Sequence, residues 1–303
     1  MRCHFFGASE APLFGCYHAP RKSAEAKPPG RRNIAVLICP PVGHEYFRCH
    51  WSLRRLAAQL ARKGFPVLRF DYFGVGDSAG NLAEIESLDV WTDNIIQARQ
   101  NLTDESGARD VIFLGVRLGG NLAARALQAK SGNSISNGDS LLQWDPLLDG
   151  DGYLSALRNM QTAMLDLWYC PVENQTASNC EELLGSIYRH ELINEIQSLA
   201  IGDAMQDERL LQACVVPTSE TQEFVSRLPH TKVLGHSDVN YWQRLDQIET
   251  AWLPTNAPKL IETEVANFAS EGSRPYGVSA NPLPQVEHAP YASLNVNAEV
   301  RSS

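Results

Sequence analysis

The fold of this chain is decided by one stretch of sequence, Val111-Ile112-Phe113-Leu114-Gly115-Val116-Arg117-Leu118-Gly119-Gly120-Asn121-Leu122-Ala123-Ala124. Its apolar start predicts a strand that is buried on both faces, as strands of parallel sheets are. A turn through Gly115, Arg117 and Gly119 follows, and the small residues after it predict a helix. A turn this sharp leaves no room for a Cβ on either side of its central residue. We therefore expect the Arg117 side chain above the sheet, beside a helix N-terminus.

The same alternation of strand and helix continues on both sides of this stretch. The apolar run 34–39 is stopped by two prolines, and residues 52–63 carry leucine and alanine at the i, i+3, i+4, i+7 spacing of an amphipathic helix. Such alternation produces right-handed βαβ units, so we predict an α/β fold with a mostly parallel, doubly wound sheet and a leading β-hairpin. The predicted strands are 3–7, 13–18, 34–39, 66–70, 111–114, 140–144, 214–216 and 231–234, and the predicted helices are 52–63, 88–102, 122–127 and 258–268.

Length and pattern together predict one domain. A chain of 303 residues can bury a sizeable core. We expect the domain to span residues 1–271, with a small helical cap or lid inserted at about 150–205. Residues 272–303 are rich in Ser, Pro, Asn and Gly without a period, which predicts a flexible tail.

Composition excludes several classes of function. Lys plus Arg is 26 and Asp plus Glu is 35, a net charge of −9, which makes the chain a poor binder of nucleic acid or anionic membranes. No apolar stretch reaches the ~18–20 residues of a membrane span, and the N-terminus lacks the apolar region of a signal peptide. The seven cysteines are an odd number without a C-x-x-C pair. They predict a cytoplasmic protein with neither a disulfide framework nor a zinc site.

No cofactor is expected either. The glycines at 74, 76 and 80 do not spell the dinucleotide fingerprint, because no apolar strand runs directly into them and no fitting helix follows.

Strand, G-x-R-x-G turn and small-residue helix together form the context of a nucleophile elbow, G-x-S-x-G, with Arg117 in the place of serine. Around it the sequence resembles the α/β-hydrolase superfamily over roughly residues 1–270. It looks closest to the serine-aminopeptidase-like hydrolases, including those associated with exosortase and exopolysaccharide gene sets. Besides the elbow, the segments that carry the resemblance are Pro12-Leu13-Phe14-Gly15-Cys16-Tyr17-His18, Cys39-Pro40-Pro41-Val42-Gly43-His44-Glu45-Tyr46 and Arg69-Phe70-Asp71-Tyr72-Phe73-Gly74-Val75-Gly76-Asp77-Ser78.

The elbow departs from the family in its central residue. The resemblance implies a serine, or sometimes a cysteine, as nucleophile. Arginine cannot replace either, because its guanidinium stays protonated and has no usable lone pair. We predict that the chain does not hydrolyse through position 117. Two roles stay open for Arg117: a ligand for a carboxylate or phosphate at the helix N-terminus, or a salt bridge to a nearby carboxylate such as Asp145 or one in the cap.

A second G-x-S-x-G string, Gly76-Asp77-Ser78-Ala79-Gly80, makes Ser78 an alternative nucleophile. The residues before it do not form a strand, and those after it do not form a tightly packed helix. We therefore favour a turn in which Ser78 makes local hydrogen bonds.

The remaining parts of a triad have candidates near strand ends. For the base, His236 follows the last predicted strand and His230, the second choice, precedes it. For the acid, the candidates are Asp145 and Glu220. A loop histidine and helix-capping carboxylates explain these residues equally well. An oxyanion hole would use backbone N–H groups of Val42, Gly43, His44 and Leu118.

Three functions follow as hypotheses. The first is a hydrolytically silent pseudoenzyme that binds a small anionic or acyl ligand or a partner protein. The second is an active esterase-like or peptidase-like hydrolase that uses another nucleophile, with Ser78 as candidate. The third, which rests on family analogy alone, is a structural component of an exopolysaccharide-related assembly.

Overall fold

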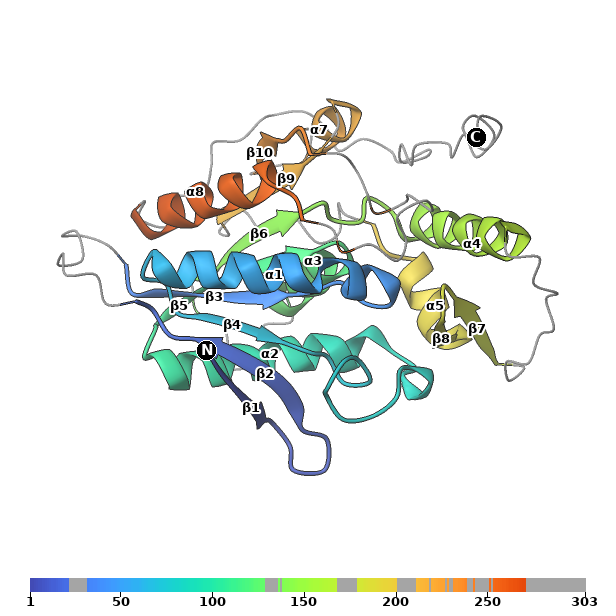
Figure 1. The fold of residues 1–303 in the computed structure, drawn as a ribbon, viewed down its shortest axis with the longest axis horizontal. Helices are drawn as coiled ribbons and strands as arrows, with labels where there is room; N and C mark the ends of the chain where they lie inside the picture. Colours follow the sequence, from blue (N-terminus) through green and yellow to red (C-terminus); the bar gives the residue numbers. More distant parts are fainter. Residues whose placement is uncertain are drawn as a thin grey trace.

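The chain forms one large twisted sheet with helices on both of its faces (Figure 1). The computed structural model describes residues 1–21, 32–128, 136, 138–167, 179–200, 211–217, 219–226, 228, 231–238, 242, 251 and 253–270.

The sheet has eight strands in the order β1-β2-β4-β3-β5-β6-β9-β10. From β4 to β10 every neighbouring pair is parallel, while β1 and β2 form an antiparallel hairpin whose second strand pairs with β4. The predicted α/β class, the mostly parallel sheet and the leading hairpin are therefore confirmed. The strands are β1 (Arg2–Phe6), β2 (Leu13–His18), β3 (Ile34–Cys39), β4 (Val67–Phe70), β5 (Asp110–Val116), β6 (Ser140–Trp144), β9 (Leu211–Val216) and β10 (Thr231–Gly235).

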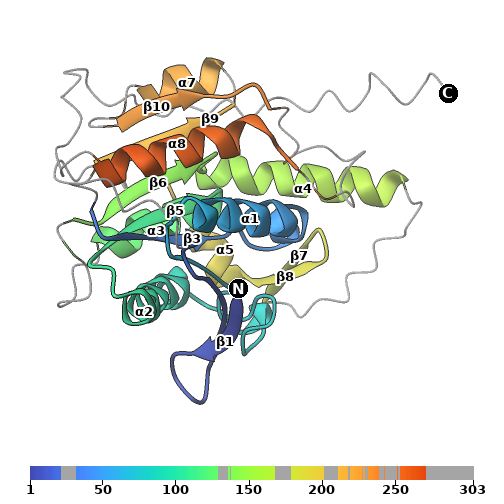
Figure 2. The ribbon, with the colours of Figure 1, turned by 60° about the vertical axis from the view of Figure 1, so that its left-hand side comes forward.

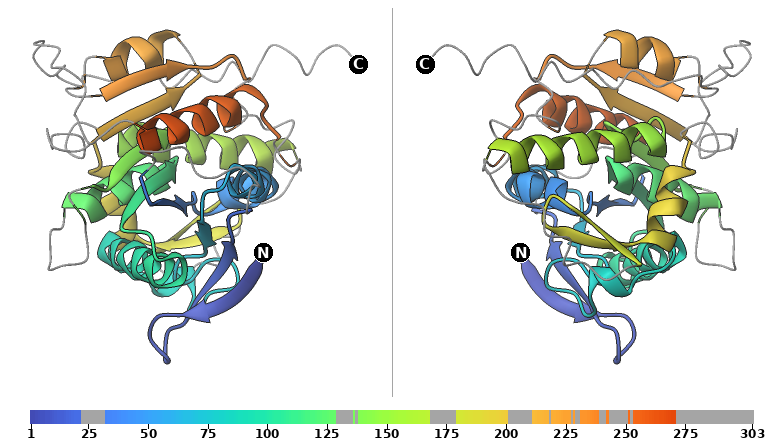
Figure 3. Two further views of the ribbon diagram at one scale, coloured as in Figure 1. Left: turned by 90° about the vertical axis from the view of Figure 1, so that its left-hand side faces the viewer. Right: turned by 90° about the vertical axis from the view of Figure 1, so that its right-hand side faces the viewer.

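Helices cover both faces of the sheet (Figures 2 and 3), and a large apolar core lies between the sheet and each of these helix layers. On one face, α1 (His44–Arg62) and α8 (Asn256–Ser270) pack against apolar side chains of the central strands. On the other face, α2 (Leu88–Ser106) and α3 (Leu118–Gln128) do the same. The central strand β3 is buried along its whole length, because its side chains face both cores in turn.

Helix α1 begins eight residues earlier than the apolar spacing predicts. Gly43 is its N-cap, with φ 61°, a conformation that residues with a side chain rarely adopt. The chain therefore enters α1 directly after Pro40-Pro41. Buried polar side chains in the first turn, Glu45 among them, interrupt the apolar spacing. The spacing alone therefore does not reveal this part of the helix.

Between β6 and β9 the chain forms α4 (Gly150–Leu167), the hairpin of β7 (Cys180–Leu183) and β8 (Ser186–Arg189), and α5 (His190–Gln197). The hairpin lies within the range where the sequence predicts a helical cap, and no strand was predicted there. Its turn uses Leu184 and Gly185, both at positive φ. The cap boundaries at about 150–205 and the domain limits of 1–271 stay predictions. The expected tail, 272–303, lies outside the described residues.

One expectation from the cysteines is wrong. The structure joins Cys3 and Cys16 by a disulfide across the β1–β2 hairpin. These residues are direct partners in the antiparallel register, with Cα atoms 4.1 Å apart. A spacing of thirteen residues along the chain carries no hint of this contact, because only the register brings the two sulfur atoms together.

Within the described ranges, no helix combines the length and the apolarity that crossing a bilayer requires.

Candidate functional site

The carboxyl ends of the parallel strands place four of the predicted site residues at one edge of the sheet. Gly43 follows β3, Arg117 follows β5, Asp145 follows β6 and His236 follows β10. In open α/β sheets, ligands and catalytic groups lie at this edge, so the candidate site is located there.

The elbow, residues Gly115–Gly119, has the tight geometry that its glycines predict. Arg117 has φ 53°, a left-handed conformation that costs of order 1–3 kcal/mol for a residue with a side chain. A Cβ on Gly115 would collide with Gly120, and a Cβ on Gly119 would collide with the carbonyl oxygens of Cys39 and Pro40. The strained turn thus holds position 117 at the sheet edge against the end of β3.

The Arg117 side chain lies inside the protein, with 7% of the residue exposed. Its Nε donates to Glu45 Oε1 at 2.9 Å, and its Nη1 donates to the Asp145 carbonyl oxygen at 3.2 Å. The guanidinium carbon also lies 5.8 Å from the ring centre of Tyr153 and 5.5 Å from that of Trp242. Of the two roles open from the sequence, this geometry is that of a salt bridge, and its carboxylate comes from Glu45 in α1 rather than from Asp145 or the cap.

Glu45 is the carboxylate that neutralises the elbow. It is 1% exposed, and burial raises the pKa of its carboxyl while the adjacent Arg117 guanidinium opposes that rise. Its second oxygen, Oε2, has no hydrogen-bond partner within the described part of the chain. A buried pair of this kind is destabilised strongly when one partner is removed, since the other charge is then left uncompensated.

His236, the first candidate for the base, and Asp145, one of the two candidates for the acid, lie next to each other. His236 Nε2 lies 3.4 Å from Asp145 Oδ1, and Trp242 Nε1 donates to Asp145 Oδ2 at 2.9 Å. The backbone N–H of Asp238 points at His236 Nδ1, 3.2 Å away, so the imidazole proton belongs on Nε2. A serine hydrolase needs the reverse arrangement, with an unprotonated Nε2 facing the nucleophile. Here the Nε2 proton is directed at Asp145.

The predicted oxyanion region is filled by a tyrosine. The Tyr188 hydroxyl from β8 lies against Gly43, where a Cβ would stand. Tyr188 is 3% exposed, and burial together with nearby Glu45 raises the pKa of its hydroxyl. His44 is buried as well, and burial followed by the charge of Arg48 lowers the pKa of its imidazole to about 4. Leu118 begins α3 and is fully buried.

Ser78 lies in a turn after β4. Its Oγ accepts from the backbone N–H of Phe14 at 2.8 Å and donates to the Asp71 carbonyl oxygen at 2.6 Å. The two hydrogen bonds join the loop to β2 and to the residue that follows β4, so both the donor and the acceptor capacity of this hydroxyl are used within the protein.

Two candidates are not placed by the structure. His230 and the side chain of Glu220 lie outside the described residues, although the backbone of Glu220 falls in α7 (Ser219–Ser226).

The sequence missed the residues that enclose the site. Glu45, Tyr153, Tyr188 and Trp242 come from four separate segments. Glu45 could have been found from its place in the His44-Glu45-Tyr46 segment, had the start of α1 been predicted there. The three aromatic residues carry no local signal. Among the residues that the structure describes, no group of three or more His, Cys, Asp or Glu side chains could hold a metal ion.

Comparison with known proteins supports a fold of the α/β-hydrolase type. The serine aminopeptidase (S33) family model matches residues 41–164, a range that includes Glu45, the elbow and Asp145. None of the curated proteins matches the chain in sequence.

Solved structures share the fold at low sequence identity. A proline iminopeptidase from Mycobacterium smegmatis is 14% identical with a TM-score of 0.54, covering 88% of this chain and 97% of the other. An esterase from Pyrococcus furiosus is 14% identical with a TM-score of 0.55, covering 88% and 89%. Est1E from Butyrivibrio proteoclasticus, solved with ferulic acid, is 13% identical with a TM-score of 0.54, covering 88% and 97%. At these identities the likeness is one of fold.

Proposed function

We propose that this chain, an α/β-hydrolase-fold protein similar to the serine aminopeptidases, is a non-hydrolysing form whose elbow has become a closed, charge-balanced structural unit. The observation that carries the proposal is the guanidinium of Arg117 at the nucleophile position, held by the buried carboxylate of Glu45. A protonated guanidinium cannot attack a carbonyl carbon.

The base supports the same conclusion. With its proton on Nε2 and Asp145 beyond it, His236 has no lone pair directed at the elbow. Its position after the last strand is that of a hydrolase base, but its hydrogen bonds serve to hold β6, β10 and the segment of Asp238 together.

The enclosure of the site supports it too. An acyl-enzyme needs room above the nucleophile for the substrate and backbone donors aimed at the oxyanion. Here Tyr153 and Trp242 lie on Arg117, and the Tyr188 hydroxyl lies against Gly43. The protein is then a scaffold that binds its ligand or partner at another place on its surface.

Turnover of short p-nitrophenyl esters and covalent labelling by a fluorophosphonate probe test the proposal on the full chain. We expect no protein-dependent turnover and no label on the wild type. We also expect no gain of turnover in Arg117→Ser, because a serine at 117 would still lack a base.

Arg117→Ser leaves Glu45 unpaired and threatens the fold, so the double variant Arg117→Ser/Glu45→Gln accompanies it. Arg125→Ser serves as the control, since Arg125 lies on α3, the helix that follows Arg117, and pairs with Asp89 near the surface. Labelled wild type would overturn the proposal. A label that maps to Ser78 and is lost in Ser78→Ala would establish the active-hydrolase alternative.

A further inference from the structure

A cationic groove lies between α1 and the part of the sheet formed by β2 and β4. His18 ends β2 opposite Val67, and Cys16 lies opposite Arg69 of β4. Since side chains alternate between faces along a strand, His18 and Arg69 share the face that α1 covers. Arg54 and Arg62 come from α1, while the backbone N–H of Arg21 is fixed to the Ala61 carbonyl oxygen at 2.8 Å.

The groove, named here the arginine groove, consists of two adjoining pockets that share Met1 and Arg54. The larger has a volume of about 450 Å³ and is lined by His18, Arg21, Arg54 and Arg62 together with alanines and Met1. None of the described residues that line it is acidic. The smaller, of about 220 Å³, is lined by Arg69 and His50 together with two carboxylates, Asp71 and Asp77.

Two polar nitrogens beside this groove are enclosed and unsatisfied. His18 is 5% exposed, and its Nε2 has no hydrogen-bond partner in the described structure. The same holds for Arg69 Nε. A buried donor without a partner costs about 1–3 kcal/mol, so such groups are rare unless something else satisfies them.

The charges in the groove repel one another. Burial, followed by the charges of Arg69, the amino group of Met1 and Arg54, lowers the pKa of His18 to about 4. Burial lowers the pKa of Arg69 as well. Elsewhere in the described chain arginines meet carboxylates, as Arg32 meets Asp110 and Arg99 meets Asp139. No described carboxylate forms an ion pair with the four arginines of the groove.

We propose that the arginine groove binds the phosphate group of a small phosphorylated molecule. Guanidinium groups match phosphate oxygens with two parallel hydrogen bonds, and a dianion offsets the mutual repulsion of several cations more fully than a carboxylate does. Arg54 lies between the two pockets and is the central ligand, with Arg21 and Arg62 on the rim. The apolar wall of alanines beside them leaves room for the organic part of the ligand. The groove uses none of the elbow residues, so this inference does not depend on the proposed function.

The structure supplies an optical probe of binding. Trp51 is 55% exposed, and the Arg54 guanidinium lies over its ring at 5.2 Å. A phosphate that engages Arg54 draws the guanidinium from the ring, so we expect the fluorescence of Trp51 to change on binding. Trp51→Phe identifies the contribution of this tryptophan to the signal.

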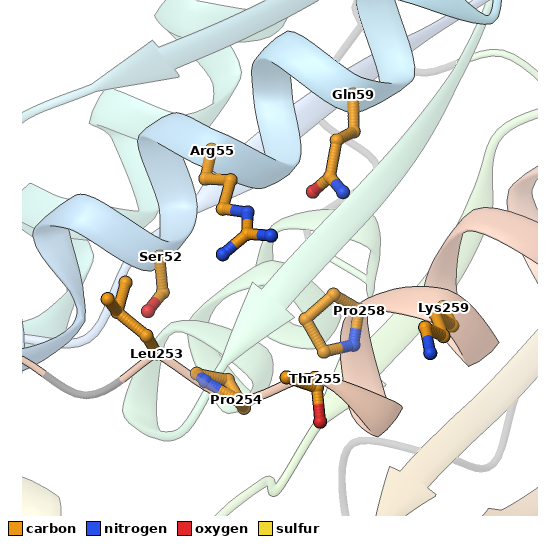
Figure 4. Close-up of a pocket in the computed structure, with 8 residues that line it drawn as sticks. All are labelled: Ser52, Arg55, Gln59, Leu253, Pro254, Thr255, Pro258 and Lys259. Atoms are coloured by element: carbon orange, nitrogen blue, oxygen red, sulfur yellow. The ribbon is translucent and has the colours of Figure 1, made fainter.

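The structure also supplies a matched control. Arg55 is the next residue of α1, is exposed like Arg54, and lines a different pocket of about 230 Å³ between α1 and the start of α8 (Figure 4). Arg54→Ala and Arg55→Ala therefore remove the same charge from the same helix, and only the first changes the groove.

The test titrates the full chain at low ionic strength with three probes: inorganic phosphate, phenyl phosphate, and phosphatidylcholine vesicles that contain phosphatidic acid. Calorimetry and Trp51 fluorescence measure binding, and the ¹³Cε1 signal of His18 measures its titration. We expect both soluble phosphates to bind and to raise the pKa of His18. Arg54→Ala should weaken binding about tenfold or more, as expected for one charge-assisted contact, while Arg55→Ala stays within about twofold of wild type.

Three results would overturn the proposal. The first is no binding of either soluble phosphate up to about 10 mM, which lies beyond the millimolar range of weak specific sites. The second is equal loss in Arg54→Ala and Arg55→Ala, which would mean attraction to overall charge. The third is binding to vesicles alone, which would assign the groove to a membrane surface instead.

Discussion

Arg117 and Arg54 have opposite electrostatic surroundings, although both are arginines of the same protein. At the elbow, the guanidinium is buried and meets a carboxylate, a carbonyl oxygen and two aromatic rings. In the arginine groove, Arg54 is exposed beside three further arginines and two histidines. Asp71 and Asp77 line the smaller pocket, but no described carboxylate forms an ion pair with Arg54. The first arrangement neutralises charge internally, whereas the second leaves charge that an anion can neutralise.

This difference separates a structural unit from a binding site. Buried ion pairs satisfy their own charges, so little interaction energy is left for a ligand. A cluster of like charges raises the free energy of the folded protein, and a ligand of opposite charge recovers that energy on binding. The resemblance to hydrolases draws attention to the elbow, but the electrostatics favour the groove as the place where this protein meets another molecule.

The largest expected effect comes from breaking the elbow pair. Glu45→Ala leaves the Arg117 guanidinium buried and unpaired, which should lower the free energy of unfolding by about 3–5 kcal/mol. Chemical denaturation measures the loss. Glu181→Ala breaks the more exposed Arg158–Glu181 pair and should cost less than about 1 kcal/mol. Replacing both partners in Glu45→Gln/Arg117→Met should recover most of the loss, and a Glu45→Ala variant as stable as wild type would contradict the comparison.

A fall in pH is expected to have an intermediate effect on the free energy of unfolding. His44 beside the elbow and His18 in the groove both have imidazole pKa values lowered to about 4, with burial as the main cause. A histidine whose pKa is lower in the folded state contributes stability that is complete above about pH 6.5 and is lost as the pH falls toward 4. For His44 this loss is of the order of 3 kcal/mol, and for His18 solvent screening makes it smaller.

Denaturation curves between pH 7 and 4 with and without phosphate distinguish the two histidines. Phosphate favours the imidazolium form of His18, so it should restore the stability that is lost at low pH through His18. His44→Gln should eliminate the part of the loss that His44 causes. Curves that phosphate leaves unchanged would count against a phosphate site at His18.

The smallest change in stability is expected in the groove. Arg54→Ala removes an exposed side chain from a repelling cluster, so the free energy of unfolding should stay within about 0.5 kcal/mol of wild type. Phosphate at a hundredfold excess over Kd should stabilise the wild type by about 2.7 kcal/mol and the variant much less. Thermal melts with and without phosphate measure both quantities. A loss of several kcal/mol without phosphate would show that Arg54 is structural, like Arg117.

The order of strands and helices could be predicted because it depends on neighbouring residues. Apolar runs such as 34–39 and 111–114 specify buried strands, and the glycines at 115 and 119 specify the elbow turn. The same local reasoning placed Arg117, Asp145 and His236 at one edge, since each directly follows a strand. The β7–β8 hairpin and the true start of α1 were missed, because polar residues interrupt the apolar spacing in both.

By itself, the sequence determined the α/β class, the parallel sheet and the arginine at the elbow, all of which follow from periodicity and from turn chemistry within a few residues. Only the tertiary structure decided which partners those residues have. Glu45 pairs with Arg117, Cys3 is bonded to Cys16, and His18 and Arg54 line one pocket, although the members of each pair are separated along the chain. Strand register and the packing of α1 on the sheet bring them together, and neither can be recognised from a short stretch of sequence.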